Sequence, residues 1–375
     1  MTTPIGTAKP MCVAQLLPAM DEGGVERGTL EVARALRQAG HRALVISAGG
    51  GMLGALADAG AEHLAMPVGR KSPLSLALVP RLRRLLVAQR VDILHLRSRF
   101  PAWLGYLAWR GMPTASRPRL VTTVHGLYSV NWYSAIMTRG ERVIAVSNAA
   151  ERYLKAHYPG LDQRRIRVIH RGVDELLYHP GYRPPRPWLE TWRASPPGQG
   201  SGPLLTIAGR LSRLKGYDDF ITLIAQLQRR GLPVRGLVVG DDGGRRRRYA
   251  ATLKQRVARE NLPVYFIGRR TDLREIFAVS NVVVSLSAQP ESFGRTVLEA
   301  LALGTPVVGY DHGGVGEILD AMFPRGAVTV GDLAAAARTV EEIQARNIRV
   351  ESSNPFTLAK MLTDTLSLYE ELIND

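Results

Sequence analysis

Short apolar runs alternate with longer amphipathic runs along most of the chain. Apolar runs of about four to eight residues are typical of buried strands, and apolar positions three and four apart are typical of helices. In the first half we expect strands at residues 11–17, 43–47, 63–66, 92–96, 120–124, 142–146 and 167–169, and helices at 25–39, 53–59, 74–88, 101–109 and 149–157. This alternation predicts a doubly wound parallel sheet, which is a Rossmann-like α/β domain.

The alternation stops at residues 177–203, where proline and glycine are frequent, and restarts beyond them. Prolines and glycines in such numbers are typical of a connecting segment. The later strands are expected at 204–208, 234–239, 264–267, 282–286, 307–309 and 327–330, and helices at 217–229, 249–259, 273–279 and 333–345. We therefore predict an N-terminal domain at 1–176, a linker at 177–203, a second Rossmann-like domain at 204–354 and a closing helix within 355–375.

The stretch at residues 290–319 carries the most informative chemistry. Glu291 and Glu299 stand eight residues apart, and an apolar-spaced run after Gly294 predicts a helix that begins between them. The N-terminus of a helix attracts phosphate, whereas a carboxylate accepts hydrogen bonds from sugar hydroxyls. The stretch therefore suits a nucleotide diphosphate sugar. Two glutamates on a solvent-exposed helix face are the simpler interpretation of that spacing taken alone.

This segment resembles the signature of the retaining glycosyltransferases of family 4. The resemblance implies the GT-B fold, in which two Rossmann-like domains face each other across a cleft and the last helix crosses back to the N-terminal domain. It also implies that Glu291 contacts the transferred sugar and that Glu299 contacts the ribose. The residues at the start of the predicted helix, Phe293, Gly294, Arg295 and Thr296, would then lie at the donor.

Three further motifs fit the same family. In Gly209 to Gly216, Arg210 and Lys215 occupy the positions of the family's phosphate-binding pair. The loop with Gly23 and Gly24 would meet the donor diphosphate and the acceptor, and His125, after a predicted strand, would contact the donor sugar. Arg269 would lie near the base. A dinucleotide dehydrogenase is disfavoured, because no G-x-G-x-x-G follows the first strand and no acidic residue ends the second.

The positive charge is concentrated in the N-terminal half. The net charge is +16, and residues 1–172 hold 24 Lys and Arg against 10 Asp and Glu. A field of one sign favours a polyanionic partner such as nucleic acid, an anionic membrane or a phosphorylated glycolipid. The alternative is an arginine-rich composition without functional meaning, since Arg outnumbers Lys 43 to 6. The single cysteine, Cys12, lies in an apolar run and is expected to be buried.

The acceptor is expected at the N-terminal domain. Residues 95–103 resemble a run in bacterial cell-envelope glycosyltransferases, including ones thought to build lipopolysaccharide core. Aromatic residues next to basic ones suit an amphiphilic, phosphorylated acceptor at a membrane interface. The candidates for contact with the acceptor or the membrane are Arg97, Arg99, Tyr128, Trp132 and Tyr133. Aromatics in an ordinary core with solvated arginines are the alternative.

These observations lead to one main hypothesis. The chain is expected to be a retaining glycosyltransferase, with His125 and Glu291 in catalysis, that uses a nucleotide sugar, preferably a UDP-sugar, and requires no metal or other cofactor. The expected acceptor is a lipid-linked, anionic saccharide at the inner membrane. The enzyme would be cytoplasmic and peripheral on that membrane, since no apolar run is long enough to span a bilayer.

Two alternatives remain open. One is a soluble glycosyltransferase with a small sugar or sugar phosphate as its acceptor. The other is a non-enzymatic protein that binds nucleic acid through its basic half. The second alternative is less favoured, because the sequence contains no recognisable nucleic-acid-binding motif.

Overall fold

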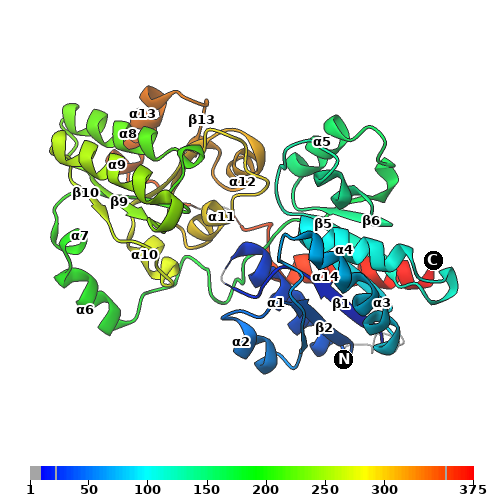
Figure 1. Ribbon diagram of the computed structural model, residues 1–375. Coiled ribbons are helices and arrows are strands. Elements are labelled where there is room, and N and C mark those ends of the chain that lie inside the picture. The colour runs from blue at the N-terminus through cyan, green and yellow to red at the C-terminus, as the bar shows by residue number, and fades with distance from the viewer. Residues whose placement is uncertain (1–9, 22, 351–352) are drawn as a thin grey trace. The chain divides into compact units, whose positions relative to one another are not determined.

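The computed structural model describes residues 10–21, 23–350 and 353–375 (Figure 1). The chain divides into two compact units. The first unit comprises Met1–His170 together with Ala359–Asp375, and the second comprises Arg171–Leu358. Each unit is built around one parallel sheet, so the predicted pair of Rossmann-like α/β domains is confirmed.

The first unit contains a seven-stranded parallel sheet in the order β3-β2-β1-β4-β5-β6-β7. Its strands are β1 (Cys12–Leu16), β2 (Arg42–Ser47), β3 (Glu62–Ala65), β4 (Ile93–Leu96), β5 (Arg119–Val124), β6 (Arg142–Ala145) and β7 (Ile166–Val168). The central strands β1 and β4 are buried along their whole length. This explains why they read as continuous apolar runs and not as alternating ones.

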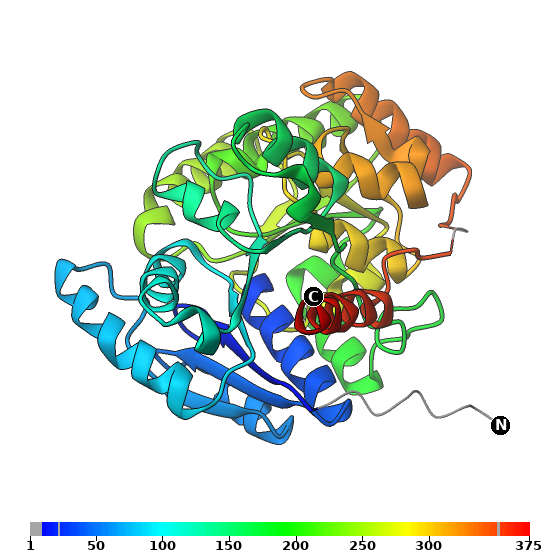
Figure 2. The same cartoon turned by 90° about the vertical axis from the view of Figure 1, so that its right-hand side faces the viewer.

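Helices cover both faces of this sheet. They are α1 (Gly24–Gln38), α2 (Leu53–Asp58), α3 (Leu78–Ala88), α4 (Arg99–Arg110), α5 (Asn148–His157) and α14 (Leu358–Asn374), with short 3-10 turns at η1 (Pro73–Ala77), η2 (Thr114–Ser116), η3 (Ser134–Thr138) and η4 (Gln163–Arg165). Figures 1 and 2 show α3 and α4 on one face of the sheet and α1 and α14 on the other. None of the helices in the described ranges is both long enough and apolar enough to span a bilayer.

The last helix, α14, returns to the first unit, which confirms the predicted crossing. Its Tyr369 is fully buried, and the Tyr369 hydroxyl lies 2.6 Å from His95 Nδ1. The other nitrogen of that ring, Nε2, lies 2.6 Å from Thr123 Oγ1. Because a buried polar group needs a hydrogen-bond partner, these contacts make His95 a structural residue that ties α14 to β4 and β5.

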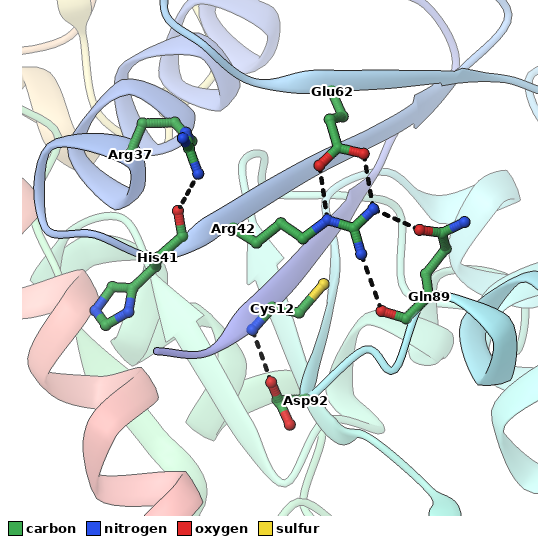
Figure 3. A network of polar contacts seen from close by, with 7 residues as sticks. All are labelled: Cys12, Arg37, His41, Arg42, Glu62, Gln89 and Asp92. Atoms are coloured by element: carbon green, nitrogen blue, oxygen red, sulfur yellow. Dashed lines mark hydrogen bonds and ion pairs between the residues drawn. The ribbon is translucent and has the colours of Figure 1, made fainter. Parts of the chain in front are cut away.

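A polar network joins the amino ends of the strands in this sheet (Figure 3). The guanidinium of Arg42 donates to both carboxylate oxygens of Glu62, at 2.6 and 2.7 Å, and to the side chain of Gln89. The Cys12 amide donates to Asp92 Oδ2 at 2.7 Å. Cys12 itself is buried as expected, and burial raises the pKa of its thiol to about 11. The network therefore fixes the register of β1, β2 and β3 and the end of α3.

The second unit contains a six-stranded parallel sheet in the order β10-β9-β8-β11-β12-β13. Its strands are β8 (Leu204–Ala208), β9 (Arg235–Val239), β10 (Val264–Phe266), β11 (Val282–Ser285), β12 (Val307–Tyr310) and β13 (Ala327–Val328). Its helices are α6 (Arg186–Ala194), α7 (Pro196–Gln199), α8 (Tyr217–Arg229), α9 (Arg247–Arg259), α10 (Leu273–Val279), α11 (Arg295–Ala302), α12 (Gly313–Met322) and α13 (Leu333–Ala345), and its 3-10 turns are η5 (Arg213–Lys215), η6 (Gly244–Arg246) and η7 (Pro324–Gly326).

The stretch predicted as a linker differs from that expectation, because it contains α6 and α7 and belongs to the second unit. The prolines at its start are compatible with a helix, since the first helical turn needs no amide hydrogen there. Trp188 and Trp192 lie one turn apart and stack with their ring centroids 5.3 Å apart. Both rings pack against a buried cluster of Leu204, Leu237, Val239 and Ile276. Apolar packing therefore turns a proline-rich connection into part of the domain.

We expect Trp188→Ala to destabilise the second unit by about 2 kcal/mol, because a large half-buried ring is lost together with its contacts. The Trp188 indole also donates to Asp272 Oδ2 at 2.6 Å, and the substitution would remove this hydrogen bond and leave that oxygen with its contact to Arg270. Denaturant unfolding followed by fluorescence measures the change. Thr191→Ala, at an exposed position on the same helix, serves as the control and should change little. Equal stability of the two variants would contradict a packing role for α6.

Candidate functional site

The candidate site of the second unit lies where the strand order reverses. The chain leaves β8 and β11 in opposite directions along the sheet, so the loops after these neighbouring strands diverge at their carboxyl ends. Ligands of open parallel sheets bind at such a point. The loop after β8 carries Arg210 and Lys215, and the loop after β11 carries Glu291. The topology thus brings together residues that are about eighty positions apart in the sequence.

The loop after β8 is held in a compact form by two contacts. The Tyr217 hydroxyl donates to the Gly209 carbonyl at 2.7 Å. Gly216 has a φ of +73°, and a Cβ at this position would lie 1.8 Å from the carbonyl oxygen of Leu286. Only glycine tolerates both the left-handed backbone and this close approach. The two loops therefore pack backbone to backbone, which places Lys215 beside the loop after β11.

Both carboxylate oxygens of Glu291 are engaged. Lys215 Nζ lies 2.7 Å from Oε2, and Ser287 Oγ donates to Oε1 at 2.5 Å. About a quarter of the side chain of each ion-pair partner is exposed, so the pair is accessible to a ligand but largely desolvated. An ammonium has three N–H donors, and Lys215 retains donors for a further anion while it is paired with Glu291.

The pKa of Glu291 reflects this environment. Burial alone would raise the pKa, but the positive charge of Lys215, hydrogen bonds from Lys215 and Ser287 and the charge of Arg210 together lower it below its ordinary value of 4.5. Glu291 is therefore ionised at neutral pH and acts as a hydrogen-bond acceptor. The ion pair stabilises the second unit above pH 4.5, and this contribution is lost as the pH falls below that value.

Sequence reasoning did not single out Ser287 and His312. Ser287 is buried, and its carbonyl accepts a hydrogen bond from His312 Nε2 at 2.8 Å. Since a carbonyl oxygen only accepts, the proton lies on Nε2. These residues follow β11 and β12, which are neighbours in the sheet. Polar residues just after two predicted strands were the sequence signal that could have identified them. His312 supports Ser287, and Ser287 in turn orients Glu291.

The helix predicted between the two glutamates is α11, and Gly294 precedes it with a φ of +105°. A Cβ on Gly294 would lie 2.8 Å from Val315 Cγ2, so both the backbone and the packing favour glycine. Phe293 is buried, with its ring edge-on to Phe356 at a centroid distance of 5.8 Å. The Phe293 side chain therefore packs in the interior of the unit, and only its backbone remains available for a donor.

Arg295 and Glu299 form a second ion pair on the first turns of α11. Arg295 Nε donates to Glu299 Oε1 at 2.9 Å, and the Glu299 side chain is only 5% exposed. A carboxylate this buried needs a partner, and the guanidinium supplies it. Thr296 is half-buried beside this pair. The two predicted donor contacts, Arg295 and Glu299, therefore touch each other directly.

Other predicted features of this unit lie on neighbouring loops. Arg269 is exposed after β10, two strands away from β8 in the sheet. Asp241 pairs with Arg246, and Asp242 pairs with Lys254 at 2.7 Å. Within the described part of the chain, no group of three or more His, Cys, Asp and Glu side chains is arranged to hold a metal ion.

In the first unit, the predicted residues lie near the carboxyl ends of the strands. His125 directly follows β5 and is half-buried. Gly23 is the N-cap of α1 and Gly24 is its first residue. A Cβ on Gly23 would lie 2.3 Å from Glu26 Oε2, so this carboxylate lies directly beside the glycine. A phosphate at Gly23 therefore requires the Glu26 side chain to move.

Arg99, Tyr128 and Tyr133 come together in the same unit. The Arg99 guanidinium lies 4.4 Å from the centre of the Tyr128 ring and 5.4 Å from that of Tyr133, and it donates to Ser134 Oγ at 3.1 Å. No carboxylate of the described residues lies within 4.0 Å of it. Burial raises the pKa of both tyrosines, and the charge of Arg99 opposes this. Arg99 is thus a preoriented cation between two aromatic rings.

The two remaining candidates of this unit differ sharply in exposure. Trp132 is 76% exposed, and its ring meets that of Trp103 at a centroid distance of 5.5 Å. Arg97 is buried, and its Nη1 donates to Gln15 Oε1 at 2.9 Å. Burial lowers the pKa of Arg97, although Tyr369, Glu31 and Glu26 oppose the shift. The end of the central strand β4 places Arg97 inside the unit, which does not fit contact with a membrane, whereas its contact with the acceptor stays a prediction.

Two family models match the chain along most of its length. Residues 22–175 match the model described as Glycosyltransferase Family 4. Residues 190–353 match the model described as Glycosyl transferases group 1. The second match begins within α6.

Comparison with a curated protein gives a partial match. D-inositol 3-phosphate glycosyltransferase of Rhodococcus erythropolis is 31% identical over 188 residues. The match covers 48% of this chain and 40% of that protein. The chain therefore spans less than half the length of this relative.

Solved structures resemble the chain along its whole length. A glycosyltransferase from Rickettsia africae has a TM-score of 0.84 and 26% identity, with 98% of this chain and 100% of that one covered. Anabaena Alr3699/HepE, solved in complex with UDP and glucose, has a TM-score of 0.80 and 22% identity, with 96% and 99% covered. WaaG, a glycosyltransferase involved in lipopolysaccharide biosynthesis, has a TM-score of 0.67 and 15% identity, with 96% and 98% covered. The last two likenesses concern the fold alone.

The contacts of Glu291 lead to a prediction for Ser287. We expect Ser287→Ala to lower kcat/KM for glycosyl transfer about 10- to 100-fold, because a hydrogen bond to a charged group contributes about 1.5–3 kcal/mol. Binding of the free nucleoside diphosphate should be unchanged, since the Ser287 hydroxyl donates to Glu291 and the substitution keeps the carbonyl that contacts His312. Steady-state kinetics and calorimetry measure the two effects.

Ser285→Ala is the matched control for this experiment. Ser285 ends β11, and its hydroxyl has no hydrogen-bond partner among the described residues. The control should keep the activity of the parent. In Ser287→Ala, the loss of the hydrogen bond to the Glu291 carboxylate should raise the pKa of Glu291 and move the acidic limb of the pH–activity profile to higher pH. Equal activity of the two variants would contradict the positioning role.

Proposed function

Because the chain has the GT-B fold and matches glycosyltransferase family models in both of its units, we propose that it transfers a sugar from a nucleoside diphosphate sugar to a saccharide or polyol acceptor with retention of configuration. A UDP-sugar is the proposed donor. The observation that carries the proposal is two ion pairs: Lys215 with Glu291, between the loops after β8 and β11, and Arg295 with Glu299, on the helix α11 that follows the second loop.

In this proposal, different residues of the second unit bind different parts of the donor. Lys215 and Arg210 hold the diphosphate, where cations stabilise the negative charge that develops on the leaving group. Glu291, kept ionised by its neighbours, accepts hydrogen bonds from hydroxyls of the transferred sugar. Glu299 accepts hydrogen bonds from the ribose, and Arg295 holds its carboxylate in place. No metal ion or other cofactor is needed for these roles.

We propose a front-face displacement for the chemical step. The bond between the anomeric carbon and the phosphate oxygen breaks on the face where the acceptor oxygen attacks. The departing phosphate oxygen takes the proton of the acceptor hydroxyl, and the products are the glycoside and the nucleoside diphosphate. His125 contributes at the transferred sugar, as the family resemblance implies.

The acceptor we propose is a small phosphorylated sugar or polyol. Arg99 is held between Tyr128 and Tyr133, and no carboxylate among the described residues pairs with it, so its guanidinium remains available for an anionic group. Guanidinium and phosphate form strong charge-assisted hydrogen bonds. The name of the Rhodococcus relative refers to a phosphorylated cyclitol, which supports the same class of acceptor.

A second candidate is transfer to a lipid-linked, anionic saccharide, such as lipopolysaccharide core, by a cytoplasmic enzyme that is peripheral on the inner membrane. The excess of basic residues in the first 172 positions favours this candidate. The two candidates are separated by product formation from soluble phosphosugars and from lipid-linked saccharides with the same donor. Transfer only to the lipid-linked acceptors would overturn the first candidate.

Substitutions of the carboxylates should separate donor affinity from transfer. We expect Glu299→Ala to weaken binding of UDP about tenfold or more, since the carboxylate contacts the nucleoside in this proposal. Glu291→Ala and His125→Ala should lower kcat about 100-fold and leave UDP binding within about twofold. Calorimetry with UDP and kinetics with a panel of nucleotide sugars measure these effects. Full activity of all three variants would overturn the site.

Arg99 should determine the affinity for an anionic acceptor. We expect Arg99→Met to raise KM for a phosphorylated acceptor about tenfold or more, because a charge-assisted hydrogen bond is lost. The KM for the donor and the hydrolysis of the donor in water should change little. Inorganic phosphate should inhibit the parent at the acceptor site and the variant only weakly. An unchanged KM for the acceptor would place the anion elsewhere.

A further inference from the structure

The positive charge of the first unit is concentrated in one segment of the chain, which includes the helical layer of α3 and α4. Residues 63–140 contain twelve Lys and Arg but a single carboxylate, Asp92. This segment forms η1, α3, β4, α4, η2, β5 and η3. Asp92 accepts the hydrogen bond from the Cys12 amide at the opening of β1, so it is engaged within the sheet. This segment, and with it the layer of α3 and α4, therefore carries almost no negative charge of its own. Among its cations, Arg119 pairs with Glu141 from outside the segment and Arg97 is buried.

The surface of this layer is also apolar around α3. Leu74 is 84% exposed and Leu76 56%, both on η1, and Val87 near the end of α3 is 51% exposed. Single exposed apolar residues are common and carry no meaning. Here three of them belong to one 3-10 turn and the helix that follows it, among basic residues.

The orientation of α3 explains why its cationic residues are exposed together with an apolar one. Leu82 and Leu86 are buried and pack the helix onto the unit. On the opposite face, Arg81, Arg84 and Val87 are exposed, at the spacing of three residues that places side chains on one side of a helix. The outward face of a helix in a soluble protein normally mixes both signs of charge. This outward face has only apolar and cationic side chains.

The cations of this surface have no acidic partners. Among the described residues, no carboxylate lies within 4.0 Å of Lys71, Arg81, Arg84 or Arg90. The helix is nonetheless held firmly, because the Arg42 guanidinium donates to the carbonyl and the side chain of Gln89, directly after α3 (Figure 3). The turn η1 and the helix α3 thus carry exposed leucines and exposed cations that have no carboxylate partner among the described residues.

We propose that the α3 surface, defined as Lys71, Leu74, Leu76, Arg81, Arg84 and Val87, docks the protein on an anionic lipid bilayer. Basic side chains are attracted to the negatively charged headgroups, and the exposed leucines enter the boundary between headgroups and acyl chains. A nucleic acid would neutralise the same cations but would gain little from leucine side chains. The inference rests on the membrane association proposed above and assigns it to residues that the sequence did not single out.

Docking through this surface is independent of the reaction. The α3 surface is carried by one unit, and none of its residues belongs to the candidate site. Binding to vesicles can therefore be measured with the full chain in the absence of donor and acceptor. Failure of docking and failure of the proposed transfer are then separate results.

The test is co-sedimentation of the full chain with vesicles of phosphatidylcholine, alone or mixed with phosphatidylglycerol, at low and high salt. We expect the parent to bind only the mixed vesicles and to be released by salt. Arg81→Glu with Arg84→Glu should weaken binding about 30-fold or more, since each basic residue near an anionic surface contributes roughly fivefold. Leu74→Ser with Leu76→Ser should weaken it about tenfold and leave the remaining binding sensitive to salt.

The matched control is Arg247→Glu with Arg248→Glu. Both residues are exposed on α9 of the second unit, and the substitutions change the total charge by the same amount as the pair on α3. The control should bind vesicles within about twofold of the parent. All variants should keep the thermal melting and UDP binding of the parent, because the substituted positions are exposed and distant in sequence from the candidate site.

Three results would overturn the proposal. Absence of parent binding to the mixed vesicles would remove the membrane association itself. Equal loss in the control would mean that total charge, and not the α3 surface, drives binding. Loss of self-association in the leucine variant, with vesicle binding unchanged, would identify a second copy of the chain as the occupant of this surface.

Discussion

The ion pair between Lys215 and Glu291 is the interaction on which the candidate site depends. The two residues approach because β8 and β11 are neighbours in the second sheet and because Gly216 allows its loop to touch the backbone of Leu286. Removing one partner of a desolvated pair leaves an uncompensated charge, which is costly. Ser287 also donates a hydrogen bond to the Glu291 carboxylate, and His312 donates one to the Ser287 carbonyl. The site is therefore organised before any donor arrives.

The two units use arginine and lysine in different ways. At the candidate site of the second unit, cations are paired with carboxylates, so their geometry is defined and their charge is available where phosphate would lie. In the first unit, Arg99 is held by aromatic rings, and the cations of the α3 surface have no acidic partners among the described residues. Paired cations give a precise local field, whereas unpaired ones produce a broad field that acts over about a Debye length.

Much of the architecture was predictable from local patterns. Apolar runs marked the strands of both sheets, and the amphipathic spacing marked α1, α8, α11 and α14 within a few residues of their ends. Glycines with left-handed backbones, such as Gly216 and Gly294, mark turns that no other residue makes as readily. The helix start between the two glutamates was predictable from the same local patterns, whereas the roles of the glutamates and of the basic loop came from the family resemblance.

The pattern of residues along the chain defines the order of the elements, the class of fold and the residue types that reach the carboxyl ends of the strands. Which of those residues meet depends on how the sheets and helices pack. Arg97 and Arg99 are two positions apart, yet one is buried against Gln15 and the other lies between two tyrosine rings. The proline-rich stretch is helical because Trp188 and Trp192 pack on a buried cluster. Ser287 is placed by its contacts with Glu291, four residues away, and with His312, which follows β12. Periodicity and turn preference act within a few residues along the chain, whereas burial and hydrogen bonding depend on neighbours that only the packed sheet supplies.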